Sequence, residues 1–159
     1  PFSGCLYFGL MHTPKGPYVI EYNCRFGDPE TQVVLPLLET DLLEIMLAIS
    51  EKRLAETEVR FSKDSAACVI LASGGYPVKY ETGKQISGLD AEGQVPGATV
   101  YHAGTKRDGD SYLTAGGRVL GVTCTAPDGE QAVRAAYAAA ENISFEGMHL
   151  RRDIGAKNR

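Results

Sequence analysis

The opening segment constrains the fold most, because two strand-like runs lie on either side of a strong turn signal. Residues 5–11 and 17–24 are rich in aromatic and aliphatic side chains, and Thr13-Pro14-Lys15-Gly16 separates them. Proline presets φ for a turn, and glycine accepts the positive φ that many turns need. A β-hairpin is therefore predicted near the start of the chain.

Two helix starts are predicted after this hairpin. Asp28 suits an N-cap, Pro29 suits the first helical position, and Glu30 suits the positive end of the helix dipole. Helical spacing then continues over the apolar positions Val33, Val34, Leu37 and Leu38. Pro36 interrupts this run. Thr40-Asp41 predicts a second cap, for a helix over 42–49. The apolar positions that this helix offers to a core are Leu42, Ile45, Leu47 and Ile49.

The charge-rich residues 51–64 mark a predicted boundary, because the sequence changes character beyond them. The continuous apolar run Ala66–Ala72 predicts a buried strand, and turn residues punctuate 78–97. Further strands are predicted at Thr99–His102, at Arg118–Thr125 and near His149, and Asp128 is expected to cap a helix over Glu130–Glu141. The whole pattern predicts an α/β (α+β) chain in two parts, residues 1–60 and 61–159.

Composition excludes several classes of protein. With 43% apolar and 23% charged residues, the chain has enough of each for a packed core and a hydrated surface. Its apolar runs are too short to cross a membrane, and a net charge of -4 argues against binding a nucleic-acid backbone. The four cysteines have neither zinc-ligand spacing nor the density of a disulfide framework, which predicts a cytoplasmic protein with reduced thiols. Three of them, Cys5, Cys68 and Cys124, lie in apolar or β-branched runs and are predicted to be buried.

Histidines and glycine pairs predict structure rather than chemistry. His12, His102 and His149 lack any metal-ligand spacing and are interpreted as packed or solvated side chains. The pairs Gly74-Gly75 and Gly116-Gly117 lack a phosphate-loop pattern. They are interpreted as tight turns, although either could approach a ligand.

The best candidate for chemistry is the second strand of the predicted hairpin. Strand alternation places Glu21, Asn23 and Arg25 on one face, about 7 Å apart at each step of two residues. A carboxylate beside an amide oxygen can hold Mg²⁺, while phosphates and waters complete its octahedron. A guanidinium one step further can fork onto a phosphate. By spacing alone, a half-exposed strand with a salt-bridged surface remains an alternative.

The segment around these residues resembles a signature of the phosphoribosylamine–glycine ligase family, within the ATP-grasp superfamily. It reads V-I-E-Y-N-C-R-F-G-D-P-E-T-Q over residues 19–32. Further resembling segments follow in the same order: Leu71–Pro77, His102–Thr105, Gly116–Leu120 and Arg151–Gly155. The resemblance thus covers nearly the whole chain. The chain resembles only the carboxy-terminal part of the family's enzymes.

The resemblance implies a function and a set of roles. The expected reaction joins glycine to 5-phosphoribosylamine at the expense of ATP, in purine synthesis, by way of glycyl phosphate. Glu21 and Asn23 match the metal-binding positions for Mg²⁺ or Mn²⁺. Arg25 and Asp28 match positions expected to hold phosphate or substrate groups, and Arg25 is also a candidate contact to ATP.

The resemblance also implies what this chain lacks. It opens without an initiator methionine and runs directly into strand-like sequence, so we expect a piece of a longer enzyme. The adenine pocket and most phosphate contacts would lie in a missing N-terminal part, and residues 1–159 alone are expected to be inactive. Two alternatives remain open: another ATP-grasp carboxylate–amine ligase, and a non-catalytic interaction domain.

Overall fold

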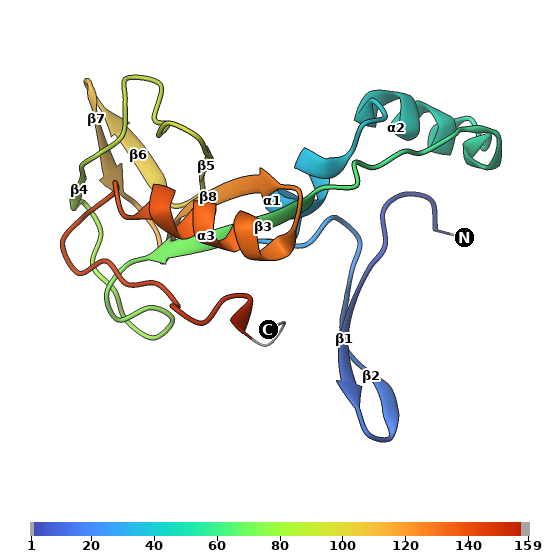
Figure 1. Cartoon of the computed structure of the whole chain (residues 1–159), viewed down its shortest axis with the longest axis horizontal. Helices are drawn as coiled ribbons and strands as arrows, with labels where there is room; N and C mark the ends of the chain where they lie inside the picture. Colours follow the sequence, from blue (N-terminus) through green and yellow to red (C-terminus); the bar gives the residue numbers. More distant parts are fainter. Residues whose placement is uncertain (1, 157–159) are drawn as a thin grey trace. The chain divides into compact units, whose positions relative to one another are not determined.

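A computed structural model describes residues 2–156, which divide into two compact units between Ser62 and Lys63. Both units contain strands and helices, so the predicted mixed α/β class is confirmed (Figure 1).

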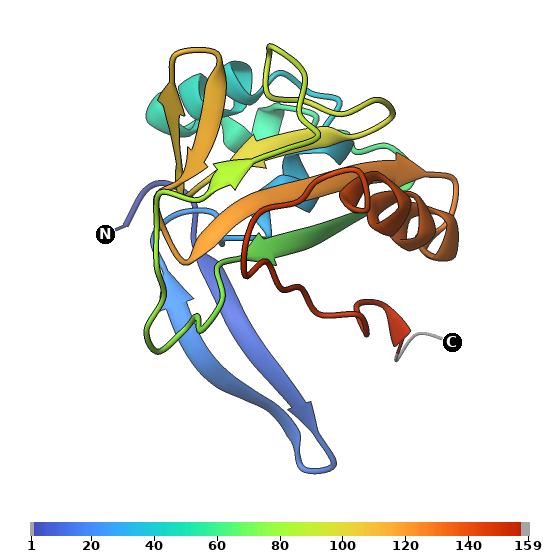
Figure 2. The same cartoon turned by 90° about the vertical axis from the view of Figure 1, so that its left-hand side faces the viewer.

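The first unit begins with the predicted hairpin. Strand β1 (Tyr7–Thr13) pairs antiparallel with β2 (Gly16–Asn23), and the two form a long twisted ribbon (Figure 2). The hydroxyl of Thr13 accepts from the Lys15 N–H at 3.1 Å and donates to the Gly16 carbonyl at 2.9 Å, which closes the turn. Many apolar side chains of the ribbon are exposed, among them Phe8 at 49% and Ile20 at 63%.

The first helix begins later than predicted. Helix α1 (Thr31–Val34) has Glu30 as its N-cap residue, so the prediction that Asp28 caps a helix starting at Pro29 is wrong. The Gly27 carbonyl accepts from the backbone N–H and the hydroxyl of Thr31 and so closes this turn. The Asp28 carboxylate instead accepts from Gln32 Nε2 at 3.0 Å.

The rest of the first unit follows the predicted caps. Helix α1 passes into a 3₁₀ turn, η1 (Leu35–Leu37), which contains the interrupting Pro36. Helix α2 (Leu42–Ser50) is capped by Asp41, whose carboxylate accepts from the Leu43 N–H at 2.7 Å. The core assignment of Leu47 is wrong, because its side chain is 47% exposed and the neighbouring Ala48 is buried instead. A second 3₁₀ turn, η2 (Leu54–Glu56), follows.

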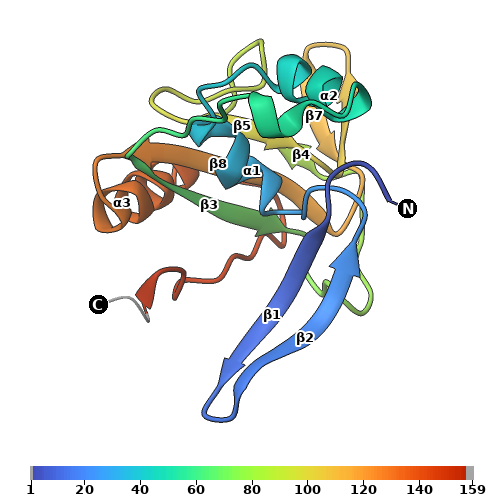
Figure 3. The ribbon, with the colours of Figure 1, turned by 90° about the vertical axis from the view of Figure 1, so that its right-hand side faces the viewer.

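The second unit is built on an antiparallel sheet with one helix across it. The strand order is β3 (Ser65–Ala72), β8 (Arg118–Ala126) and β5 (Thr99–His102), and Figure 3 shows β3 and β8 side by side. Helix α3 (Gly129–Ala140) packs against β3 and β8. Its predicted cap is confirmed, because the Asp128 carboxylate accepts from the Gln131 N–H at 2.8 Å. Buried residues of β3, β8 and α3 form much of the core, including Val69, Leu71, Leu120, Val122, Ala132 and Ala136.

A second sheet and one bridge depart from the sequence prediction. Strands β4 (Gln85–Ile86), β7 (Ser111–Thr114) and β6 (Thr105–Asp108) form a small antiparallel sheet that no periodicity predicted. The predicted strand near His149 is a single bridge to Ala72, with backbone hydrogen bonds of 2.9 and 3.0 Å. Strand β4 and the bridge depend on partners distant in sequence, which local patterns do not record, whereas β6 and β7 form a local hairpin across Gly109 and Asp110.

Gly74-Gly75 lies in a turn, as predicted, Gly116-Gly117 lies in a bend, and the two segments meet. Ser73 donates from its N–H to the Gly117 carbonyl and from its hydroxyl to the Gly116 carbonyl, each at 2.8 Å. A Cβ placed on Gly117 would lie 2.1 Å from Cδ2 of the Tyr76 ring. The absence of a side chain at Gly117 therefore makes room for Tyr76.

Candidate functional site

The two predicted metal ligands lie together near the end of β2. In the antiparallel register Glu21 faces Gly9 and Asn23 faces Tyr7, so all four residues share one face of the hairpin. Asn23 Nδ2 donates to Glu21 Oε1 at 3.0 Å. The spacing of two residues therefore brings the carboxylate and the amide head groups into contact.

The chemistry of this pair fits a hard divalent cation. Glu21 supplies a carboxylate and Asn23 an amide oxygen, the donor types that Mg²⁺ and Mn²⁺ take in proteins. Within residues 2–156, no cluster of three or more His, Cys, Asp or Glu side chains is suited to a metal ion. The pair could thus hold only part of an ion's coordination shell, leaving positions for substrate phosphates and water.

Arg25 lies beyond the strand, so the alternation argument does not extend to it. Strand β2 ends at Asn23, and residues 24 and 25 form a bend. The exposed Arg25 guanidinium donates from Nη1 to the Phe26 carbonyl at 2.8 Å. This bond fixes one edge of the guanidinium and leaves it further N–H groups for an anion.

Tyr7 and Glu30 belong to the same region, although the sequence analysis did not single out Tyr7 and gave Glu30 only a helix-terminus role. Tyr7 Oη donates to Glu30 Oε1 at 3.0 Å and so joins β1 to the turn after β2. This hydrogen bond, followed by burial and by the charges of Glu30 and Glu21, raises the pKa of Tyr7. Tyr7 is the first residue of β1, and a tyrosine at the start of a strand carries no local signal of such a contact. Only the folded path of the chain after β2 brings Glu30 to it.

Gln32 is the second side chain that the sequence analysis missed. Its Nε2 is bound to Asp28, which fixes the orientation of the amide because a carboxylate only accepts. Its Oε1 is buried and has no hydrogen-bond partner among residues 2–156. Asp28 itself is exposed, so its carboxylate can be reached by a ligand.

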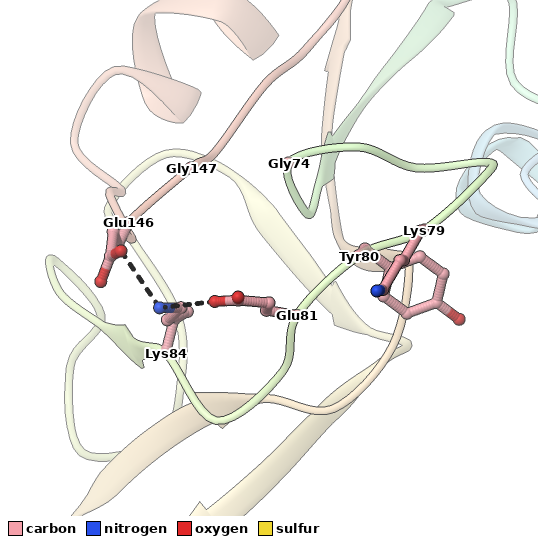
Figure 4. Close-up of a pocket in the computed structure, with 7 residues that line it drawn as sticks. All are labelled: Gly74, Lys79, Tyr80, Glu81, Lys84, Glu146 and Gly147. Atoms are coloured by element: carbon pink, nitrogen blue, oxygen red, sulfur yellow. Dashed lines mark hydrogen bonds and ion pairs between the residues drawn. The ribbon is translucent and has the colours of Figure 1, made fainter.

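The second unit contains a pocket of about 310 Å³, shown in Figure 4. Lys84 lines it, and the Nζ of this lysine lies 3.0 Å from Glu81 Oε2 and 3.1 Å from Glu146 Oε1. Hydrogen bonds to Glu81 and then to Glu146 raise the pKa of Lys84, which favours the protonated form of this amine. Lys79, Tyr80, Gly74 and Gly147 complete the lining. With two lysines and two glutamates, the pocket has no excess of either charge.

Cysteines and histidines take mostly structural positions. Cys124 is buried as predicted, its Sγ donates to the Gly97 carbonyl at 3.4 Å, and burial raises its pKa. Cys5 and Cys68 are only half-buried, so that part of the prediction is wrong.

His102 is held by a carbonyl, a hydroxyl and an aromatic ring. Its Nε2 lies 2.9 Å from the Gly93 carbonyl and its Nδ1 3.0 Å from Thr105 Oγ1, and the ring packs on Tyr112. His12 and His149 are exposed. These positions agree with the prediction of packed or solvated histidines. In residues 2–156 no helix is long and apolar enough to cross a membrane.

Two family models match the chain. Residues 66–157 match the phosphoribosylglycinamide synthetase C domain, and residues 1–31 match the ATP-grasp (A) domain of the same enzyme.

Curated relatives agree along nearly the whole chain. The phosphoribosylamine–glycine ligase of Chlorobaculum tepidum is 49% identical over 156 residues, which are 98% of this chain and 37% of the relative. That of a Synechocystis species is 48% identical, over 98% of this chain and 38% of the relative. The chain thus spans little more than a third of the length of these relatives.

A solved structure shows the same fold. The crystal structure of phosphoribosylamine–glycine ligase from Thermotoga maritima superposes with a TM-score of 0.72 at 35% sequence identity, over 93% of this chain and 36% of that one. The sequence and structural matches identify the same parts in the same order. The chain therefore belongs to the phosphoribosylglycinamide synthetase family of purine-biosynthesis ligases, and it comprises the end of the ATP-grasp domain followed by the C domain.

Proposed function

We propose that this chain is the C-terminal part of an ATP-dependent ligase that joins glycine to 5-phosphoribosylamine. One observation carries the proposal: Glu21 and Asn23 present a carboxylate and an amide in contact on one face of β2, directly before the R-F-G-D-P-E-T-Q segment. This placement suits a site that handles the phosphates of ATP. The alternative of a purely structural strand does not by itself explain why a carboxylate and an amide oxygen share one face directly before this segment.

The reaction would proceed in two steps. A carboxylate oxygen of glycine attacks the γ-phosphorus of ATP, so that an O–P bond forms and ADP leaves, giving glycyl phosphate. The amine of 5-phosphoribosylamine then attacks the acyl carbon, a C–N bond forms, phosphate leaves, and the nitrogen loses a proton. Negative charge concentrates on the transferring phosphoryl group in the first step and on the departing phosphate in the second.

Each predicted site residue has a role in this scheme. Glu21 and Asn23 would hold Mg²⁺ or Mn²⁺, and the bound ion would supply neutralising charge to the phosphates. Arg25, whose guanidinium is fixed at one edge by the Phe26 carbonyl, would bind a phosphoryl oxygen of ATP or of the acyl phosphate. Asp28, exposed and already holding the Gln32 amide, would accept a hydrogen bond from a substrate amine.

The remainder of the site would come from a preceding part of the same enzyme. Relatives of this chain are nearly three times as long, and the hairpin exposes Phe8, Ile20 and Tyr22, which a packed ATP-grasp domain would cover. That part would supply the adenine pocket and most contacts to the phosphates. The isolated chain is accordingly proposed to be inactive. The exposed thiol of Cys24 and the absence of any disulfide among the described cysteines support a cytoplasmic location.

The proposal is tested in the full-length ligase with the variants Glu21→Gln and Asn23→Leu. Glu21→Gln replaces the charged carboxylate by a neutral amide and Asn23→Leu removes the amide oxygen, so turnover should fall by orders of magnitude, and raised Mg²⁺ should partly restore Glu21→Gln by mass action. Glu39→Gln, an exposed carboxylate of the same unit, is the matched control and should retain wild-type turnover. Steady-state kinetics over a Mg²⁺ series and a thermal melt of each variant separate lost chemistry from lost folding. Near wild-type turnover in both site variants would refute the assignment.

A further inference from the structure

Strand β1 lies directly beside the proposed ion-binding pair. The register sets Gly9 opposite Glu21 and Tyr7 opposite Asn23. Residues paired across an antiparallel ribbon point to the same face, so whatever occupies position 9 is the immediate neighbour of the Glu21 side chain.

Gly9 leaves the space that the Glu21 side chain occupies. A Cβ built on Gly9 would lie 3.1 Å from Glu21 Cγ, which is tighter than an ordinary carbon contact, whereas the Glu21 backbone N and O would both lie at 3.6 Å. The φ of Gly9 lies outside the left-handed region, so the backbone itself does not require glycine. A side chain at position 9 would therefore push on the Glu21 side chain rather than on its backbone.

A bulge in the same place sets the direction of Glu21. The pairing runs from Gly9↔Glu21 to Leu10↔Val19, so Ile20 has no partner across the ribbon. An extra residue of this kind bends a strand and re-aims the neighbouring side chain. Two independent features, one on each strand, thus act on the same carboxylate.

We propose that Gly9 is a positioning residue for the ion-binding carboxylate of Glu21. The inference depends on the proposed role of Glu21 and Asn23 and extends it to the opposite strand. A displacement of Cγ by a few tenths of an ångström is carried outward to the carboxylate oxygens. Such a shift matters because Mg²⁺ demands near-ideal octahedral geometry. Neighbours that only orient a ligand commonly change metal affinity by about 10- to 100-fold when they are altered.

The test is a double-mutant cycle in the full-length ligase, with Mn²⁺ binding as its readout. Mn²⁺ affinity is measured by electron paramagnetic resonance at a fixed concentration of a non-hydrolysable ATP analogue, for wild type, Gly9→Ala, Glu21→Gln and the double variant. Gly9→Ala should weaken Mn²⁺ binding about 10-fold when Glu21 is present. It should have little further effect in Glu21→Gln, because the carboxylate that it displaces is already replaced by a neutral amide, which is a weaker ligand.

Stability separates positioning from a general disturbance of the hairpin. Gln has the shape of Glu, so Gly9→Ala should shift the melting temperature equally in both backgrounds. Alanine suits a strand interior at least as well as glycine, so the variant is expected to fold. Gly129→Ala is the matched control, since a Cβ there meets nothing within 4 Å, and it should leave Mn²⁺ affinity unchanged.

The outcomes distinguish this inference from the function on which it rests. If Glu21→Gln itself leaves Mn²⁺ affinity unchanged, the proposed ion site is wrong. If Glu21→Gln weakens binding but Gly9→Ala does not, the ion site stands and the positioning role of Gly9 is refuted. An equal loss on Gly9→Ala in both backgrounds also refutes it, because the effect then does not act through Glu21.

Discussion

Replacing Gly117 by alanine tests the contact between the two glycine-rich turns. A Cβ at this position would lie 2.1 Å from Cδ2 and 2.7 Å from Cε2 of Tyr76. Ordinary carbon contacts begin near 3.4 Å, so the ring must retreat by about 1.3 Å or the β8 backbone must move. The Ser73 hydrogen bonds to Gly116 and Gly117 hold the two turns together and oppose that movement.

The expected cost follows from this overlap. Overpacking of a fitted site typically costs about 1–3 kcal/mol. For a domain of the size of the second unit, each kcal/mol lost from the free energy of unfolding lowers the melting temperature by about 4–8 °C. A loss of about 2 kcal/mol would therefore lower it by about 8–16 °C.

The assay is thermal unfolding of the chain, followed by tyrosine circular dichroism, for Gly117→Ala, Tyr76→Ala and the double variant. Removing the Tyr76 ring removes the overlap, so Gly117→Ala should lower the stability of the chain only slightly when residue 76 is already alanine. Gly129→Ala, which introduces a methyl group into open space at the start of α3, should be neutral or slightly stabilising. A melting temperature of Gly117→Ala within 1 °C of wild type, or additive costs in the double variant, would refute the contact.

Three further predictions concern thiols, a helix cap and nucleotide binding. When the native chain is treated with iodoacetamide at about pH 8, exposed Cys24 should be alkylated first. Cys124 should be alkylated last, because it is buried and burial raises its pKa. Early modification of Cys124, detected by mass spectrometry, would contradict this prediction. The hydrogen bond from the Gln131 N–H, then that from its side chain, lowers the pKa of Asp128 below its ordinary 3.8. The cap therefore stabilises the fold at pH values above this ordinary pKa, and its contribution is lost as the pH falls through the lower pKa of the folded state. The melting temperatures of wild type and Asp128→Ala should accordingly differ near neutrality and converge in strong acid. Asp128→Asn, which keeps an acceptor, should retain its advantage over Asp128→Ala at every pH. Finally, calorimetry of residues 1–159 with MgATP should show no micromolar affinity, since about -8 kcal/mol would have to come from a partial site.

The predicted site depended on both local and distant information. Glu21 and Asn23 could be placed on one face from the sequence, because strand alternation is a local property. Arg25 could not, because where a strand ends depends on its partner, and β2 ends at Asn23. Tyr7 was missed for the same reason: its contact with Glu30 spans 23 residues and exists only in the folded register.

The sequence by itself determined the elements that are specified by short-range signals. The hairpin turn, the caps at Asp41 and Asp128 and the apolar strand β3 all formed where turn chemistry, capping side chains and hydrophobic periodicity predicted. The tertiary structure alone decided how β4 pairs with β7 and that the glycine pairs meet through Ser73 and Tyr76. Each of these is stabilised by a backbone or side-chain partner far along the chain, and no local pattern records which partner the fold will supply.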